Sequence, residues 1–386
     1  MSKKIVISLI AILILGIVAI GVVAIKKISP KEPLTDASSN EKVTPEEIKD
    51  IFFVHSYDAE NICGRPQDNG AVAKLKQLGY EDGKNIRIHY FYMDTKNTYT
   101  TSAQMKERGD LALAKIKEVD PAVIFIIDDD AFRYVALPLA KSKYPIVFSG
   151  MNVQIENYNK EVDMMESRQH PGYNITGVLE TVHYTESFLL LQKIAPNVKN
   201  VLCVSDSTAT GRGFVVALKL EMAKTAEFPV EVEFREVASY EEYKKIVLEA
   251  NKREDIDAIL PAVFGLAPEK AGDKSVVQPE ITNWTVKNSK KPDVGLTFFL
   301  VDFGLLSGAA VDFPALGGQT AIKIAKILEG EQPGNISIDE AANVAICVNL
   351  ARAEQLGFKV SQEVIAASDK VYVSMKAYPE YKMEEK

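Results

Sequence analysis

The chain has 386 residues, a formal net charge of −8 and a pI near 5.3, and 47% of its residues are hydrophobic. This acidic balance argues against nucleic acid or an anionic membrane surface as a partner, while the hydrophobic and charged fractions are typical of a globular protein. Cys63, Cys203 and Cys347 are too few for a disulfide scaffold, and the last two lie in apolar runs typical of buried residues.

The first predicted element is an uninterrupted apolar segment, residues 5–25, with two lysines on either side. At about 1.5 Å per residue it is long enough to cross the ~30 Å hydrocarbon core of a bilayer. No small-residue cleavage site follows it, so we expect an uncleaved signal anchor over residues 1–28, with a cleaved signal peptide as the alternative. The very short N-terminal tail favours an extracytoplasmic location for the rest of the chain. Residues 29–50, rich in Pro, Ser, Glu and Lys, are expected to form a linker.

From residue 51 onward, runs typical of strands alternate with helical patterns. In the first half, we expect strands at 51–54, 86–92, 123–127 and 146–148, helices at 71–78 and 102–119, and a kink or short helix at Pro138. In the second half, we expect helices at 184–194, 214–226, 240–250 and 316–329, and strands at 201–205, 230–237, 258–260, 294–299 and 344–348. Such alternation predicts right-handed crossovers and doubly wound parallel sheets, and the length suits two domains.

The candidate ligand-binding residues follow the predicted strands, because ligands of open α/β sheets bind beyond the carboxyl ends of the strands. The first half contributes Ser56, Tyr57, Asp129, Asp130 and Asn152, and the second half contributes Asp206, Ser207, Thr208, Phe264 and Phe299. Hydroxyls, carboxylates, amides and aromatic rings together suit a small polar organic molecule with an apolar part. The alternative for each Asp, Ser or Thr is a helix N-cap.

No cofactor signature is found, and a metal site is a minor alternative, formed if His55, Cys63 and the carboxylates of Asp128, Asp129 and Asp130 approach one another.

Several motifs along the chain, taken in their order and spacing, resemble the ABC transporter substrate-binding protein family of the periplasmic-binding-protein type I group. Within this family, the chain resembles most the branch whose members also serve as sensor domains of membrane histidine kinases. The motifs are VHSY (54–57), GYEDGKNI (79–86), IDDDAF (127–132), IVFSGMN (146–152), ITGV (175–178) with Glu180, SDST (205–208), LGGQ (316–319), ILEGEQP (327–333) and NLARAEQLGF (349–358). The resemblance implies a non-enzymatic protein of two Rossmann-like lobes that clamp a ligand in the cleft between them, with contacts from the strand ends named above and permease subunits as partners.

The resemblance, together with the restart of the strand–helix alternation, gives expected lobe boundaries. We expect the first lobe to comprise residues 51–172 plus about 302–334, and the second to comprise 173–301 plus about 335–375. Residues 376–386 are expected to form a charged C-terminal tail.

Three consecutive aspartates, Asp128, Asp129 and Asp130, fit a ligand carboxylate poorly and favour an amine, a cation, or hydroxyl and amide groups. The predicted function is therefore a membrane-anchored extracytoplasmic solute-binding protein, which captures an amino-acid-like or amine-bearing ligand for an ABC transporter. A ligand-sensing receptor with a separate signalling partner is the alternative. A more remote one is a haloacid-dehalogenase-like phosphatase, suggested by aspartates after a strand but opposed by the late position of that strand.

Overall fold

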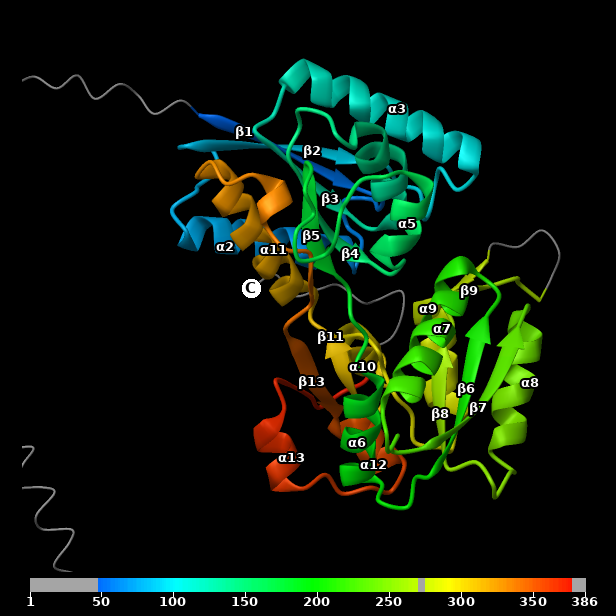
Figure 1. Ribbon diagram of the computed structural model, residues 1–386. Coiled ribbons are helices and arrows are strands. Elements are labelled where there is room, and N and C mark those ends of the chain that lie inside the picture. The colour runs from blue at the N-terminus through cyan, green and yellow to red at the C-terminus, as the bar shows by residue number, and fades with distance from the viewer. Residues whose placement is uncertain (1–47, 270–274, 377–386) are drawn as a thin grey trace, which may run out of the picture. The chain divides into compact units, whose positions relative to one another are not determined.

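The computed structural model describes residues 48–269 and 275–376 (Figure 1). The predicted anchor over residues 1–28, nearly all of the linker and residues 377–386 of the tail therefore lie outside the described part. Within that part, none of the helices combines the length and the apolar character needed to span a bilayer.

The first lobe is built on a six-stranded parallel sheet with the order β12-β5-β4-β3-β1-β2. Its strands are β1 (Lys49–His55), β2 (Ile86–Tyr92), β3 (Val123–Ile127), β4 (Ile146–Met151), β5 (Ile175–Leu179) and β12 (Asp339–Glu340). β3 is buried along its whole length, as its continuous apolar sequence predicts for a central parallel strand.

Helices cover both faces of this sheet (Figure 1). They are α2 (Gly64–Gln77), α3 (Ser102–Val119), α4 (Asp129–Ala131), η1 (Phe132–Ala136), η2 (Leu137–Leu139), α5 (Ile155–Glu161), α11 (Phe313–Leu328) and η3 (Pro333–Asn335). Successive side chains of a strand point to opposite faces. Phe53 of β1 thus packs with α2 and α11, whereas Phe52 packs with α3, η1 and α5. The short η2 contains Pro138, as expected.

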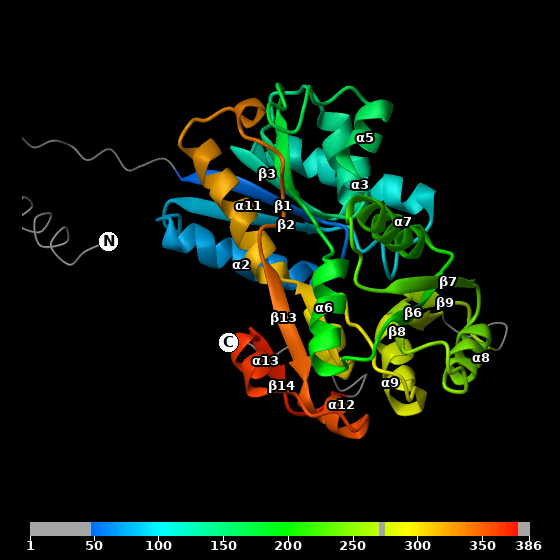
Figure 2. The ribbon, with the colours of Figure 1, turned by 60° about the horizontal axis from the view of Figure 1, so that its bottom comes forward.

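Helices α2 and α11 lie side by side on one face of the sheet (Figures 1 and 2). Glycines make this close approach possible. A Cβ atom on Gly70 would lie 2.0 Å from the carbonyl oxygen of Pro314, and one on Gly317 would lie 1.9 Å from that of Gln67. Gly317 of the LGGQ motif therefore serves helix packing, whereas its neighbour Gly318 makes only ordinary contacts.

The second lobe contains two three-stranded sheets with the orders β7-β6-β8 and β11-β13-β14. Their strands are β6 (Asn200–Asp206), β7 (Glu231–Val237), β8 (Ala258–Ala262), β11 (Ser307–Val311), β13 (Val344–Asn349) and β14 (Lys370–Tyr372), with a small separate pair β9 (Gly265–Leu266) and β10 (Val276–Val277). Residues 293–297 connect β8 to β11 through single bridges.

One predicted strand of the second lobe is wrong. A strand was predicted over 294–299, but Phe298 already begins helix α10 (Phe298–Phe303). A short apolar run does not distinguish a strand from a buried helix, which explains the error.

The remaining helices of the second lobe are α6 (Tyr184–Ile194), α7 (Ala209–Lys224), α8 (Tyr240–Ala250), α9 (Gln278–Asn288), α12 (Leu350–Gln355) and α13 (Gln362–Ala367). The single tryptophan of the sequence, Trp284, belongs to α9. Its ring packs edge-on against Tyr240 and Tyr243 of α8, with ring centroids 6.3 and 6.2 Å apart.

The C-terminal segment is fixed to the second lobe by a buried ion pair. Arg352 and Asp293 are both fully buried, and the guanidinium Nη2 lies 2.5 Å from the carboxylate Oδ2. The same guanidinium donates to the carbonyl oxygen of Val286 at 2.8 Å, and the side chain of Asn349 caps the backbone N–H of Arg352 at 3.0 Å. The NLARAEQLGF motif is thus a structural element in this chain.

Sheet membership differs from the predicted boundary at residue 172. β5 and β12 belong to the first sheet, so the chain leaves the first lobe after Leu179, and β11 lies in the second lobe although residues 302–334 were assigned to the first. α11 packs on the first sheet, as predicted. The difference arises because residues 175–179 were treated as a motif and not as a strand.

Candidate functional site

The strand ends of the first lobe bring together residues that follow five neighbouring strands, β5, β4, β3, β1 and β2. In the pairing register, His55 of β1 lies opposite Ile127 of β3, and Met151 of β4 lies opposite Leu179 of β5. The side chains that follow these strands therefore share one edge of the sheet. We call this group the acidic strand-end cluster; it consists of Tyr57, Lys96, Asp128, Asp129, Asp130, Asn152 and Glu180.

Asp128 holds the centre of this cluster. It is buried, it caps α4, and its carboxylate accepts a hydrogen bond of 2.5 Å from the hydroxyl of Tyr57. Burial, followed by repulsion from Asp128, raises the pKa of Tyr57, so this hydroxyl remains a donor. The backbone of Asp128 has φ 75° and ψ 166°, a combination that is nearly restricted to glycine and tends to occur at functional sites.

Asp129 and Asp130 also have partners inside the lobe. Asp129 accepts from the backbone N–H of Asn152 at 3.0 Å and from the hydroxyl of Tyr158 at 2.9 Å. Asp130 accepts from the hydroxyl of Thr95 at 2.8 Å. Burial, with repulsion from Asp128, raises the pKa of Asp129 to about 6, although these hydrogen bonds oppose the shift.

Lys96 supplies next to the aspartates a positive charge that was expected from a ligand amine or cation. Its ammonium lies 3.2 Å from Asp128 and 2.8 Å from Asp130, and 38% of its side chain is exposed. Desolvation opposes this charge, but the two carboxylates outweigh it and hold the pKa of Lys96 above its ordinary value. Sequence reasoning missed Lys96 because it lies in the loop after β2, with no pattern that marks it.

Glu180 was part of a motif in the sequence but was not proposed as a site residue. It follows β5 and is half-buried. Burial and repulsion from Asp128 and Asp129 raise its pKa to about 8. The signal available in the sequence was a carboxylate directly after the apolar run of residues 175–179, which forms strand β5.

Ser56 supports the cluster from behind. It is fully buried, and its hydroxyl donates to the carbonyl oxygen of Ile127 at 3.2 Å and accepts from the N–H of Ala131 at 2.8 Å. Asn152 is half-buried and contributes its backbone N–H to Asp129. The structure therefore places Tyr57, Asp129, Asp130 and Asn152 together, with Ser56 as an internal support.

The predicted residues of the second lobe divide into different environments. Asp206 is buried and accepts from the N–H of Thr208 at 2.9 Å and from that of Gly265 at 3.2 Å, so it organises the loop after β6. The Thr208 side chain caps α7, and Ser207 is exposed. Phe264 is half-buried against Phe214, with ring centroids 4.6 Å apart.

Phe299 was expected to line the cleft, but it is only 1% exposed. It belongs to an apolar core with Phe303 and Phe313, stacked on the latter with centroids 6.3 Å apart. The reason is the helix that replaces the predicted strand end at this position. Among the described residues, no hydrogen bond or ion pair joins the strand-end groups of the two lobes.

The metal alternative finds little support in the described ranges, which contain no group of three or more His, Cys, Asp or Glu side chains suited to hold a metal ion. His55 is fully buried and its Nε2 lies 2.9 Å from Asp68 of α2. Burial, with repulsion from Glu180 and Asp128, raises the pKa of Cys63, which keeps its sulfur a thiol rather than a metal-binding thiolate.

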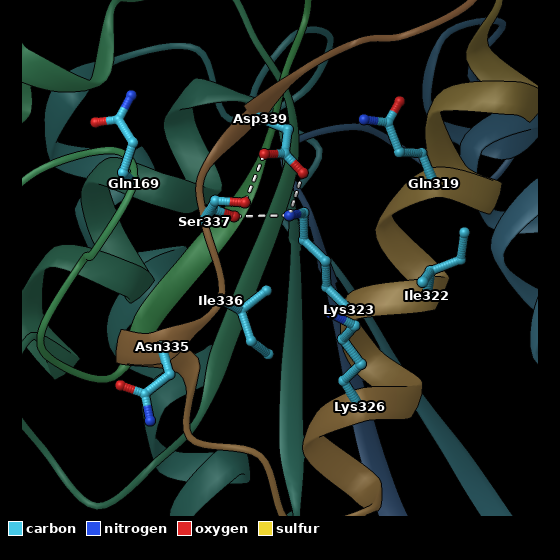
Figure 3. A pocket seen from close by; sticks show the side chains of 9 residues that line it. All are labelled: Gln169, Gln319, Ile322, Lys323, Lys326, Asn335, Ile336, Ser337 and Asp339. Carbon is cyan, nitrogen blue, oxygen red and sulfur yellow. Dashed lines mark hydrogen bonds and ion pairs between the residues drawn. The ribbon is translucent and has the colours of Figure 1, made fainter.

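Two cavities lie elsewhere. One of ≈360 Å³ lies between α11 and the segment from η3 to β12 (Figure 3). In it, Lys323 donates to the carbonyl oxygen of Ser337 and to the carboxylate of Asp339, both at 2.6 Å, so its charge is already paired. The other, of ≈760 Å³, is a shallow depression along α8. Neither contains a residue that was predicted to bind ligand.

Comparison with known protein families shows which family the chain belongs to. The family model of ABC transporter substrate binding proteins matches residues 66–372. The chain belongs to this family. Members bind substrates rather than convert them, so the protein is not an enzyme and the phosphatase alternative is wrong.

Relatives with known ligands or structures support the fold. A tyrosine-binding protein of Clostridioides difficile (strain R20291) is 19% identical over 287 residues, which is 72% of this chain and 73% of the relative. An ABC domain of Streptococcus pneumoniae, solved in complex with L-Trp, superposes with a TM-score of 0.63 at 18% identity, covering 84% of this chain and 100% of that one. A ligand-free, open substrate binding protein with adhesive properties from Clostridium difficile also gives 0.63, at 19% identity, covering 85% of this chain and 100% of that one. The predicted periplasmic binding protein type I fold is thereby confirmed.

Proposed function

We propose that this protein captures a small amine-bearing, amino-acid-like ligand between its two lobes and delivers it to the permease of an ABC transporter. The observation that carries this proposal is the excess of carboxylates in the acidic strand-end cluster. Four acidic side chains, Asp128, Asp129, Asp130 and Glu180, share this edge of the sheet, and among the described residues Lys96 alone forms ion pairs with them, to Asp128 and Asp130. A site of this charge attracts a ligand cation and repels an unpaired ligand carboxylate.

The apolar part of the ligand is proposed to contact aromatic rings of both lobes. Tyr57 belongs to the acidic strand-end cluster, and Phe264 is half-buried at the end of β8. The ligands named for two relatives, tyrosine and L-Trp, combine an ammonium group with an aromatic ring and so fit this chemistry. Ser207 and Thr208 are proposed to supply hydroxyls from the second lobe.

The location is also part of the proposal. The family acts on substrates outside the cytoplasm, and we propose that residues 5–25 keep this protein attached to the membrane with its lobes on the extracytoplasmic side. N-terminal sequencing of protein extracted from membranes tests the anchor. A mature chain that begins near residue 26 would mean that the segment is a cleaved signal peptide.

A thermal-shift screen of the purified full chain tests the ligand class. Amino acids, amines, nucleobases, polyamines and metal ions should be compared at equal concentration. A ligand at 100 times its dissociation constant stabilises the folded state by about 2.7 kcal/mol. We expect aromatic or other apolar L-amino acids to give the largest shift. A shift produced only by nucleobases or by metal ions would reject the amino-acid class.

A further inference from the structure

The carboxylate of Glu180 occupies an unusual position in the acidic strand-end cluster. Its backbone N–H donates to the carbonyl oxygen of Met151 at 3.2 Å, which fixes the residue beside the end of β4. The residue is half-buried, and its side chain makes no hydrogen bond or ion pair with any of the described residues. An ionised carboxylate offers about four acceptor positions, so Glu180 retains unused acceptor capacity next to the site.

The three aspartates differ from Glu180 in this respect. Asp128 is bound by Tyr57 and Lys96, Asp129 by Asn152 and Tyr158, and Asp130 by Thr95 and Lys96. A ligand ammonium at these aspartates would have to displace an internal donor. At Glu180 it would displace none from the described part of the chain.

Apart from Lys96, the titratable groups that interact electrostatically with Glu180 are acidic. Tyr57 and Cys63 face it from the segment that follows β1, Asp128 and Asp129 from the end of β3, and Tyr184 from the start of α6. The nearby cation, Lys96, is already shared by Asp128 and Asp130. Without ligand, Glu180 therefore favours its neutral, protonated form, and an added cation would reverse this preference.

We propose that Glu180 receives the ammonium group of the ligand, and that its carboxyl group releases its proton to solvent when the ligand binds. The ammonium remains protonated, and the ion pair with Glu180 replaces the lost O–H bond. This inference rests on the proposed function, because it takes the bound ligand to be an amine. It makes Glu180, and not the aspartate triplet, the residue that selects for an amine.

Isothermal titration calorimetry of the detergent-solubilised full chain tests the proposal. The probes are L-tryptophan, L-tyrosine, tryptamine and indole-3-propionate, the last of which lacks the amine. Titrations at pH 7 in buffers of different ionisation enthalpy give the number of protons released. With a pKa of about 8, Glu180 should release about 0.9 proton per ligand. Affinity should fall about tenfold per pH unit below pH 8, and indole-3-propionate should not bind.

The variant Glu180→Gln keeps the shape of the side chain and removes its charge. We expect it to bind the amine probes about 10- to 150-fold more weakly, the range of a hydrogen bond to a charged group, and to release no proton. Glu363→Gln is the matched control, since the Glu363 side chain is 84% exposed in the second lobe, and it should bind like the natural protein. Circular dichroism without ligand checks that each variant is folded.

Each outcome has a defined meaning. If L-tryptophan or L-tyrosine binds without proton release, or if folded Glu180→Gln binds equally well, the role of Glu180 is refuted while the proposed function remains. If no amine probe binds to the natural protein, both proposals are rejected. If the variant does not fold, proton release and the preference for tryptamine over indole-3-propionate in the natural protein decide the question.

Discussion

Lys96 determines how the acidic residues of the site coexist. Three consecutive aspartates repel one another unless a cation compensates, and the chain itself provides that cation from the loop after β2. From the sequence, this compensation was expected to come from an amine or a cation of the ligand. What remains for a ligand is the acceptor capacity of Glu180, which Lys96 does not reach, and the charge of Asp129, which has no ion pair with Lys96.

Replacing Lys96 with methionine should destabilise the unliganded protein by about 1–2 kcal/mol, because two carboxylates lose their counter-charge in a partly exposed site. Urea denaturation at pH 7 measures this change. Lys106→Met is the control, since Lys106 and its partner Asp110 on α3 are both mostly exposed, and it should change stability by less than about 0.5 kcal/mol. Equal effects of the two variants would show that Lys96 has no special role.

Glu180 should lower the stability of the unliganded protein at alkaline pH. The pKa of Glu180 is raised in the folded state to about 8, compared with about 4.3 in the unfolded chain. The favourable contribution of Glu180 to the free energy of unfolding is therefore complete below pH 4.3 and is lost as the pH rises through 8. Glu180→Gln cannot ionise. We expect it to match the natural protein near pH 4.5 and to exceed its stability at pH 9 by on the order of 2 kcal/mol, measured by urea denaturation at both pH values. Parallel pH profiles would contradict the assigned pKa.

At the scale of elements, the contact between α2 and α11 connects segments that are far apart in the sequence. α11 returns to the first lobe after the chain has built most of the second, and the glycines at the contact allow its backbone to approach α2 closely. The lobe that carries the acidic strand-end cluster is therefore completed late in the chain.

Gly317→Ala should destabilise the protein by about 1–3 kcal/mol, because the new Cβ would lie 1.9 Å from the carbonyl oxygen of Gln67 and the helices would have to separate. Its neighbour Gly318 is the control in the same helix. A Cβ there would lie 3.7 Å from the nearest atom, so Gly318→Ala should gain up to about 1 kcal/mol from helix propensity. Thermal denaturation of both variants measures the difference, and a stable Gly317→Ala variant would refute the close contact.

For the whole molecule, the described residues belong to one compact unit. We expect a chain that begins at residue 48 to fold cooperatively and to bind ligand with the affinity of the full chain, within about threefold, because all the interactions described above lie within the remaining residues. Calorimetric titration of both chains measures this. A truncated chain that aggregates or does not bind would assign the first 47 residues a structural role.

The sequence predicted the fold better than the site, for identifiable reasons. Strands such as β3 and helices such as α3 have strong hydrophobic periodicity, and the order of motifs identified the family. The strand-end rule placed Tyr57, Asp129 and Asp130 at one edge of the sheet, where the structure has them, and their role in binding stays a prediction. However, hydrogen-bond partners from distant segments are invisible in a sequence, so Lys96 was missed and the internal role of Asp206 was not recognised. The prediction that Phe299 lines the cleft was wrong because this residue lies in a buried helix and not at the end of a strand.

The position of the single tryptophan gives the protein a built-in optical probe. Trp284 lies between α9 and α8, next to Tyr240 and Tyr243, and none of these residues belongs to the candidate site. Its fluorescence should therefore report the melting of the second lobe. Far-ultraviolet circular dichroism reports both lobes. If the two signals follow different denaturation curves, the lobes unfold in separate steps, and a ligand that joins them should make the curves coincide.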